Sequence, residues 1–499
     1  MLKLSKDIWV LLAAILFIAA NALFVSNGNY LLLGLPFVLI VGVVLLFAPN
    51  TVFWVLVFLI PLSIPLRRII PGLSFDFWVP TEPVIFTVML LVFANALFKR
   101  SFEKRLLTEP VFYAILFLLG WIAIAIIPSE MPIVSAKYLL SRTWFVVVFF
   151  YFGYSLFQRN PSNIRRFLLL FGLGLTTVAL ITLVNHAGKG LLNQRAAHGA
   201  CTPFFIDHTS YGAALAFGIP AIAALLFTAK RIFIKFFWGG LLLFLLVAMV
   251  FSYSRAAWLS LIFAGGIWVI YLLRIRFKTV AMLFVGVVLL FVVVREPILN
   301  SLEKNTTESS GDLKEHLVSM VNISTDASNM ERINRWNAAI RMFNERPFFG
   351  WGPGTYMFLY APFQRSYQKT IISTNFGTLG NAHSEYLGLL SESGLPSVLG
   401  YSLILVFTFL VGFRSIRQLA DKRDRIFLLA SMLGLLTYVV HGFLNNFLDV
   451  DKIAAPFWAY IAMVLSICHT APRVGSGKKQ HNEGLIVESE KSKGEEIGK

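Results

Sequence analysis

Long runs of apolar residues, separated by short polar or charged segments, repeat along most of the chain. A helix needs about 20 mostly apolar residues to cross the hydrocarbon of a bilayer. Runs of about this length predict fourteen transmembrane helices, at 8–25, 30–47, 51–66, 82–98, 110–128, 139–157, 166–184, 209–228, 232–252, 255–273, 277–295, 385–412, 427–446 and 453–469. The predicted fold class is therefore all-α, a polytopic helical membrane protein.

The pattern also predicts how the chain is organised. We expect an N-terminal transmembrane bundle of about eleven helices at 1–295, an external loop at 296–384, C-terminal transmembrane helices at 385–469, and a disordered cytoplasmic tail at 470–499. The opening MLKLSK and the apolar run after it could be a signal peptide, but no convincing small-residue cleavage site precedes Asn27. We therefore interpret this segment as a retained first helix.

One amphipathic helix is predicted inside the external loop. In ERINRWNAAIRMFNERP, the apolar residues Ile333, Trp336, Ile340 and Phe343 recur at spacings of three and four, which indicates one face of a helix. Pro347 should end this helix, because a proline disfavours helical geometry in the residue before it. The following GWGPGTY predicts a glycine-rich turn.

Composition and charge place the chain in a membrane. The sequence is 57% hydrophobic and 14% charged, with a mean hydropathy of +0.73, which excludes a soluble domain of this length. The net charge of +17 could suggest a nucleic-acid partner, but its distribution does not. Lys and Arg gather in alternate short segments, at Lys3 and Lys6, 99–105, 158–166, 229–235, 274–278 and 413–425.

Those segments hold 20 Lys or Arg, against about 8 in the intervening loops and helix ends. This bias is typical of the positive-inside rule. It predicts a multi-pass protein of the cytoplasmic (inner) membrane with both termini in the cytoplasm, and no nucleic-acid partner. It also places three stretches outside, at 67–82, 185–210 and 296–384.

Two classes of site have no sequence support. Cys201 and Cys468 fall at opposite faces of the predicted topology, so we expect no internal disulfide. No cluster of cysteines or histidines has metal-ligand spacing, so we predict no metal and no cofactor. The GSGKK of the tail lacks the spacing of a phosphate-binding loop.

Arg255, in SYSRAAWLSL, follows one apolar run and opens the next. The topology puts it at the outer end of the tenth predicted helix. A charge among apolar residues near the interface commonly faces a polar cavity or a partner, although snorkelling to lipid headgroups is an alternative. Other polar residues are predicted on the same outer face, namely Arg142, Arg195, His198, Arg332, Arg335, His383 and Glu385.

The charges of the external loop are segregated. Residues 296–331 hold seven acidic and two basic side chains, whereas 332–382 hold six basic and one acidic. A basic segment beside the membrane suits a phosphate or diphosphate group. A solvated helical hairpin with paired surface charges is the alternative interpretation.

These residue types suggest one chemistry. Guanidinium groups make bidentate hydrogen bonds to phosphate oxygens and stabilise charge on a departing diphosphate. His383, kept neutral near pH 7 by nearby cations, could take a proton from an attacking sugar hydroxyl. A metal ion is not required if arginine stabilises the leaving group.

Three ordered motifs indicate a family. They are SYSRAAWLSL, then RINRWNAAIRMFNERPFFGWGPG with an arginine four residues before a tryptophan, then AHSEYLGLLSESGLPSVLG. In order, in spacing and in the external loop between them, they resemble the O-antigen ligase and O-antigen polymerase superfamily of bacterial polytopic membrane glycosyltransferases. The motifs cover about 150 residues towards the carboxyl end.

The resemblance implies metal-independent, inverting transfer of a glycan from undecaprenyl diphosphate to an acceptor hydroxyl on the outer face of the membrane. By motif position, Arg255 and Arg332 would bind the diphosphate and His383 would be the catalytic base. Arg195, Arg142 and Arg335 are secondary candidates. Glu385 is expected to orient a partner or cap the helix rather than act as the base.

The acceptor stays open at this point. A ligase passes the glycan to a lipid A core, a polymerase passes it to the next lipid-linked repeat unit, and related members glycosylate protein hydroxyls. From a different class, a lipid-linked glycan flippase or transporter would show comparable halves and charges near the membrane midplane. A purely structural membrane component is a further alternative.

Overall fold

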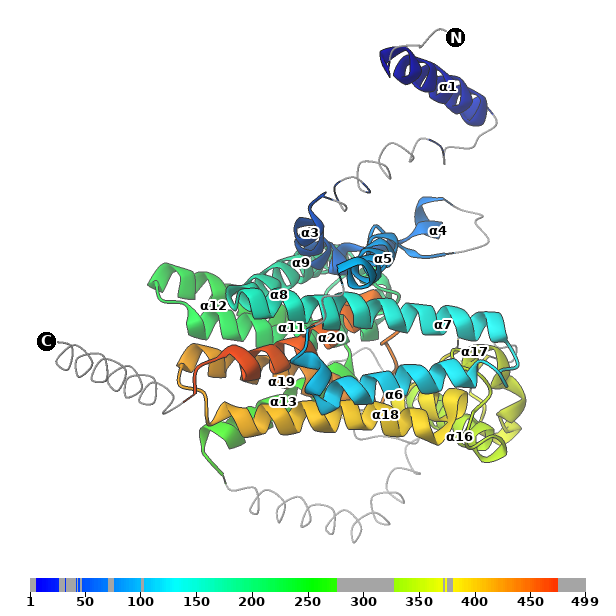
Figure 1. Cartoon of the computed structure of the whole chain (residues 1–499). Coiled ribbons are helices and arrows are strands. Elements are labelled where there is room, and N and C mark those ends of the chain that lie inside the picture. Colours follow the sequence, from blue (N-terminus) through cyan, green and yellow to red (C-terminus); the bar gives the residue numbers. More distant parts are fainter. Residues whose placement is uncertain are drawn as a thin grey trace, which may run out of the picture. The chain divides into compact units, whose positions relative to one another are not determined.

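A computed structural model describes the chain at residues 6–26, 32, 42, 44, 47–70, 76–99, 103–275, 327–370, 373, 374 and 380–473. Most of these residues lie in helices (Figure 1), which confirms the predicted all-α membrane class. The described residues contain one small sheet, in which β1 (Ile64–Pro65) pairs antiparallel with β2 (Trp78–Val79).

Among the described residues, nine helical segments are long and apolar enough to cross a membrane. They are α5 (Thr81–Lys99), the continuous run of α7 (Pro132–Phe145), the π-helical η4 (Val146–Phe152) and α8 (Gly153–Arg159), then α9 (Ser162–Ala187), α11 (His208–Thr228), α12 (Ile232–Val250), α13 (Arg255–Leu272), α18 (Glu385–Ile416), α19 (Lys422–His441) and α20 (Asp451–Thr470).

The described residues form further helices besides these nine segments. They are α1 (Lys6–Ser26), α3 (Pro49–Leu59), η2 (Ile60–Leu62), α4 (Leu66–Ile69), η3 (Leu106–Thr108), α6 (Pro110–Ala125), α10 (Gln194–Ala200), α16 (Ala327–Glu345), α17 (Tyr356–Leu359), η5 (Ala361–Phe363) and η6 (Ser366–Gln368).

Several boundaries differ from the predicted spans. The predicted helix at 277–295, and nearly all of that at 30–47, lie outside the described residues, so the count of fourteen stays a prediction. The span predicted at 51–66 is shorter, because Pro61 converts the chain to a 3₁₀ turn after α3. The span predicted to start at 139 begins at α7, with a proline in its first turn.

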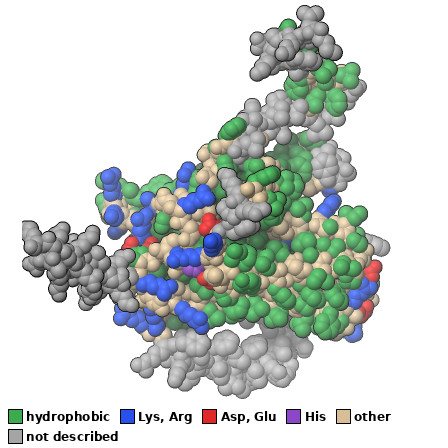
Figure 2. Space-filling view, viewed as in Figure 1, with side chains coloured by type: hydrophobic (Ala, Val, Ile, Leu, Met, Phe, Trp, Pro, Cys, Tyr) green, Lys and Arg blue, Asp and Glu red, His purple; other side chains and the backbone are tan. Residues whose placement is uncertain are grey.

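Basic segments gather at one end of the bundle formed after α3. The Arg105 guanidinium donates to the His469 carbonyl oxygen (2.8 Å), and Leu419 forms an isolated bridge with Arg473. Figure 2 shows Lys and Arg at this end and apolar side chains over the flank of the bundle. Charged ends and an apolar flank are the distribution that a bilayer requires.

The helix α20 is the centre of the packed core. In its apolar stretch, which is long enough to cross a membrane, 89% of the residues are buried. The helix packs against α8, η4, α18 and α19. At its first turn, Lys452 and Asp451 form a fully buried ion pair (3.0 Å). Asp451 accepts hydrogen bonds from the hydroxyls of Ser63 and Thr81 (both 2.6 Å), so the β1–β2 hairpin is attached to the start of α20.

The glycine-rich segment after α16 docks on a break in α18. Gly394 has a φ of 74°, which interrupts the helix and frees backbone groups. Those groups pair with the segment, because Trp351 and Gly352 donate to the carbonyls of Ser391 (3.1 Å) and Glu392 (2.8 Å). A Cβ at Gly394 would lie 2.0 Å from the Phe348 carbonyl oxygen, so this close approach requires glycine. The paired contacts hold α16 and α17 at the start of α18 (Figure 1).

Candidate functional site

A tight turn between α12 and α13 presents Arg255. The Ser252 hydroxyl donates to the Met249 carbonyl oxygen (2.7 Å) and accepts from the backbone N–H of Ser254 (3.3 Å). The Trp258 indole N–H reaches back over the turn to the same Met249 carbonyl (2.7 Å). Arg255 follows as the first residue of α13 and is half-buried. The residues of the SYSRAAW motif therefore form a turn that places Arg255 at the N-terminus of α13.

Tyr253 connects this turn to the 185–210 segment. Its hydroxyl donates to the Leu191 carbonyl oxygen (3.2 Å), and its ring makes an edge contact with His186 (6.1 Å between centroids). Arg195 lies in α10 of that segment and is exposed. The His198 ring stacks on that of His208, with 4.0 Å between the ring centroids. The segment contacts the turn through Tyr253, while its own arginine is exposed.

The helix α16 brings Arg332 to His383. This helix confirms the predicted one and ends at Glu345, two residues before Pro347. The Trp336 indole N–H donates to the His383 carbonyl oxygen (3.1 Å). Arg332 lies one helical turn before Trp336, and its guanidinium donates to the Asn329 side chain (3.0 Å). The spacing of arginine and tryptophan in the motif thus sets Arg332 beside the histidine.

The buried face of α16 differs from the predicted one. Ala338, Ala339 and Met342 are buried, whereas Ile340, expected on the apolar face, is 42% exposed. The small alanines let the helix approach its neighbours closely, which a face of large side chains would prevent. The apolar pattern identified the helix but not its orientation.

His383 holds an uncommon backbone conformation. Its φ is +48°, and among the described residues only Tyr253 and Arg274 are other non-glycine residues with positive φ. The Asn381 side-chain oxygen accepts from the His383 backbone N–H (3.1 Å), while Trp336 holds its carbonyl. Strained residues of this kind cluster at functional sites, where the surrounding structure holds them in place.

Electrostatics keep the His383 ring neutral. Burial lowers the pKa of His383, and the cations Arg335 and Arg332 lower it further, to about 4. The Asn445 side-chain oxygen lies 3.4 Å from His383 Nδ1, and the Asn445 amide nitrogen lies 3.1 Å from Nε2 of His441. At pH 7 the imidazole of His383 is therefore unprotonated on one nitrogen and able to accept a proton.

His441 links this group to the Arg255 turn. Arg332 lies within electrostatic reach of His441, whose ring lies at the backbone of Ala256, the residue after Arg255. The helices α13 and α19, which carry Arg255 and His441, pack directly against each other. The structure thus gathers Arg255, Arg332 and His383 around one end of α19.

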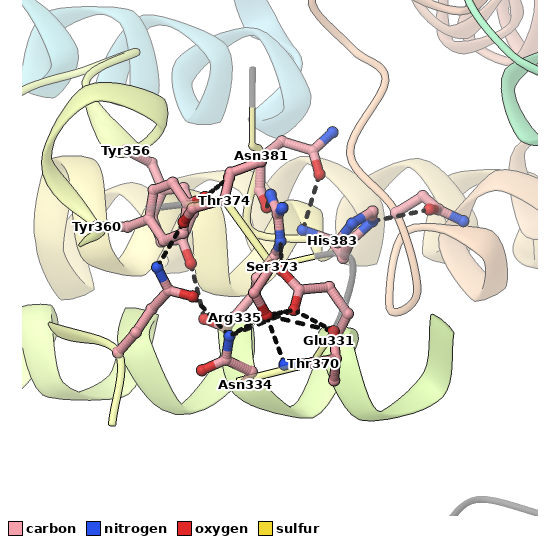
Figure 3. A network of polar contacts seen from close by, with 12 residues as sticks. Glu331, Asn334, Arg335, Tyr356, Tyr360, Thr370, Ser373, Thr374, Asn381 and His383 are labelled. Carbon is pink, nitrogen blue, oxygen red and sulfur yellow. Dashed lines mark hydrogen bonds and ion pairs between the residues drawn. The ribbon is translucent and has the colours of Figure 1, made fainter. Parts of the chain in front are cut away.

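Arg335 is engaged in a polar network that supports the loop. Its guanidinium donates to Glu331 (2.6 Å) and to the Asn381 carbonyl oxygen (3.1 Å), and it is 6% exposed. Figure 3 shows this network reaching Thr370, Ser373 and Thr374. Burial would raise the pKa of Glu331, but hydrogen bonds from Ser373 and Arg335 outweigh it and lower that pKa. Arg335 therefore orders residues near His383 and is largely withdrawn from the surface.

Arg142 and Glu385 pair with each other. Glu385 Oε1 accepts from the Arg142 guanidinium (3.1 Å), and Oε2 accepts from the Tyr438 hydroxyl (2.8 Å). Both are buried, at 8% and 2% exposed. Arg142 lies well inside the run that begins at Pro132, because that helix starts earlier than the apolar pattern indicated. Ser384, not Glu385, caps α18.

Sequence reasoning missed several residues of this site. Asn381, Asn445 and His441 contact or support His383, and Trp336 was assigned only to a helix face. A signal was present, because His441 and Asn445 both fall inside the predicted apolar span 427–446. Polar residues at such positions commonly mark a functional interior. Within the described residues, no group of three or more His, Cys, Asp or Glu side chains could hold a metal ion.

Comparison with known families agrees with the ordered motifs. A family model described as O-antigen ligase matches residues 240–402. This match confirms the predicted resemblance to the O-antigen ligase superfamily over that part of the chain. It spans the Arg255 turn, α16, His383 and the break in α18, so the superfamily domain contains most of the candidate site. No curated protein matches the chain. The apolar helices indicate a membrane protein, and the matched part of the chain is similar to O-antigen ligases, which supports a transferase in general terms.

Proposed function

We propose that the protein is a membrane glycosyltransferase of the O-antigen ligase type. It transfers a glycan from undecaprenyl diphosphate to an acceptor hydroxyl, at the outer face of the cytoplasmic membrane. The observation that carries this proposal is the contact between two motifs of the O-antigen ligase domain. The hydrogen bond from Trp336 to His383 sets a cationic helix beside a neutral, half-buried imidazole.

The diphosphate would bind between Arg255 and Arg332. Arg255 is the first residue of α13, where the helix dipole already presents positive charge. A cation at this position opposes the dipole unless an anion is present, so the arrangement favours an anionic ligand. Arg332 supplies a second guanidinium from α16. Two such groups would bind the diphosphate and stabilise the charge that develops on it as the leaving group.

His383 would act as the general base. The acceptor hydroxyl attacks the anomeric carbon from the face opposite the diphosphate, so the reaction inverts that carbon. The new C–O bond forms as the bond to the diphosphate breaks, the hydroxyl proton passes to His383, and the diphosphate leaves with the bonding electrons. Side chains of the protein supply each of these roles, so the proposal is a metal-independent reaction in which added chelator leaves the rate unchanged.

Arg142, Glu385 and Arg335 take structural roles in this proposal. Each is buried in an ion pair, and removal of one partner of a buried pair destabilises a protein by about 3–5 kcal/mol. Arg195 is exposed on α10 and has no assigned role. Arg142, Glu385 and Arg335 therefore support the site rather than bind the donor.

The test is chemical analysis of surface glycans after deletion of the gene. For a ligase, the lipid A core anchor should carry no polymer, and wild-type protein should restore it. For a polymerase of the same superfamily, the anchor should carry single repeat units. An unchanged glycan profile would contradict both versions of the proposal. Accumulation of the lipid-linked glycan on the cytoplasmic side would instead favour a flippase.

A further inference from the structure

Two buried side chains lie behind His383 and connect it to α19. Asn445 and His441 are 2% and 1% exposed, and neither was assigned a role in the reaction above. Asn445 lies one helical turn after His441, in the loop that follows α19. Its amide lies between the two imidazoles, with Oδ1 towards His383 Nδ1 (3.4 Å) and Nδ2 towards His441 Nε2 (3.1 Å).

The chemistry of the amide determines where the protons lie. An amide NH₂ group can only donate a hydrogen bond, and an amide oxygen can only accept one. His441 Nε2 therefore accepts from Asn445, and the neutral His441 ring carries its proton on Nδ1. On the other side, the Asn445 oxygen accepts from a proton on His383 Nδ1. The lone pair of His383 is then on Nε2.

We propose that Asn445, oriented by His441, is a positioning residue that makes Nε2 the basic nitrogen of His383. This inference rests on the proposed role of His383 as the base. The reverse amide orientation would donate to His383 Nδ1 and leave the proton on Nε2. The ring nitrogen that meets the acceptor hydroxyl would then be unable to take a proton.

The arrangement serves His383 before and after proton transfer. When Nε2 takes the proton from the hydroxyl, the ring becomes an imidazolium with a proton on each nitrogen. The bond from Nδ1–H to Asn445 persists and becomes charge-assisted, which strengthens it. The separation of 3.4 Å is long for a hydrogen bond, and catalytic hydrogen bonds commonly shorten when the substrate is bound.

A spectroscopic experiment tests the position of the proton directly. The full chain is labelled with ¹³C,¹⁵N-histidine, reconstituted in lipid vesicles and studied by solid-state NMR at neutral pH. The chain has eight histidines, and the signal of His383 is the one lost in His383→Ala. We expect this signal to show a protonated Nδ1 and an unprotonated Nε2. A proton on Nε2 in the wild-type protein would overturn the inference, and this measurement needs no folded Asn445 variant.

A kinetic experiment adds a matched control. The assay uses the lipid-linked glycan extracted from cells that lack the protein. Asn445→Ala should lower kcat by about 10- to 100-fold, with KM for the donor changed less than about twofold, because general-base catalysis is lost while donor binding is kept. Most of the His383 signal of this variant should come from the tautomer with its proton on Nε2, because the loss of kcat follows the share of rings in that form.

Asn446→Ala is the control, because the adjacent Asn446 has no hydrogen bond to either histidine among the contacts of the described residues. It should keep the wild-type kcat and the wild-type His383 signal. An equal loss of kcat in both variants, or full activity of Asn445→Ala, would contradict the positioning role. If His383→Ala retains full transfer, the proposed function itself fails; if His383→Ala is inactive but Asn445→Ala is not, only this inference fails.

Discussion

The Trp336→Phe substitution tests how the protein holds His383 in its uncommon conformation. Phenylalanine keeps an aromatic ring on α16 and removes the indole N–H that donates to the His383 carbonyl oxygen (3.1 Å). The φ of +48° at His383 costs on the order of 1–3 kcal/mol, so contacts around it must offset that cost. The bond from Trp336 and the bond to Asn381 are two such contacts.

The expected loss follows from these values. A hydrogen bond contributes about 1 kcal/mol net, which corresponds to about a fivefold change in the population of the held conformation. We predict that Trp336→Phe lowers kcat about fivefold and leaves KM for the donor nearly unchanged. Trp336→Phe combined with Asn381→Ala should lose about 2 kcal/mol, or about 30-fold, because both contacts are then absent.

The assay compares this variant with Trp351→Phe. The Trp351 indole N–H also donates to a backbone carbonyl oxygen, that of Met342 (2.9 Å). Met342 lies in α16, as Trp336 does, but this bond does not involve His383. The two substitutions remove equivalent bonds, so their effects on thermal stability should be similar. Only Trp336→Phe should lower kcat. Equal kcat values for the two variants would refute the view that Trp336 acts through His383.

Three further predictions concern charge and topology. Arg332→Lys should transfer glycan no better than Arg332→Ala, since a point charge cannot replace a bidentate guanidinium; full rescue in a transfer assay would contradict bidentate binding. The pKa of His383 lies below its usual 6.5, at about 4, so the imidazole stays neutral as the pH falls through 6.5. A plot of kcat/KM against pH should therefore stay flat down to about pH 5. A fall of kcat/KM to half its value near pH 6.5 would contradict the assignment of His383 as the base. A cysteine in place of Tyr367, which is 74% exposed, should react with an impermeant thiol reagent in intact cells, whereas a cysteine in place of Lys230 should not. The native Cys201 and Cys468 are buried, so they should add little background reaction. The reverse pattern of labelling would contradict the predicted orientation in the membrane.

The sequence predicted the parts of the fold that depend on local pattern. Apolar runs located α5, α9, α11, α12 and α13 to within a few residues, because burial in a bilayer requires length and hydropathy alone. The position of helix ends was less certain. The span predicted to reach 446 ends at His441, since apolar composition continues past the end of the helix.

Contacts between distant segments could not be predicted in this way. The motifs suggested that Arg332 and His383 share a site, but the bond from Trp336 that joins their segments depends on how α16 is rotated. The pairing of Arg142 with Glu385 joins helices that are far apart in sequence, and no local pattern specifies it. The candidate arginines therefore differ in their surroundings, because Arg335 and Arg142 form buried ion pairs.

The measurement that tests the central claim most directly is binding of undecaprenyl diphosphate to the purified full chain, paired with glycan transfer by the same preparations. We predict that Arg255→Ala and Arg332→Ala each weaken binding at least tenfold, at about 1.5–3 kcal/mol for a charge-assisted contact. His383→Ala should bind the diphosphate as well as the wild-type protein and transfer no glycan. Wild-type affinity in both arginine variants, or glycan transfer by His383→Ala, would contradict the account.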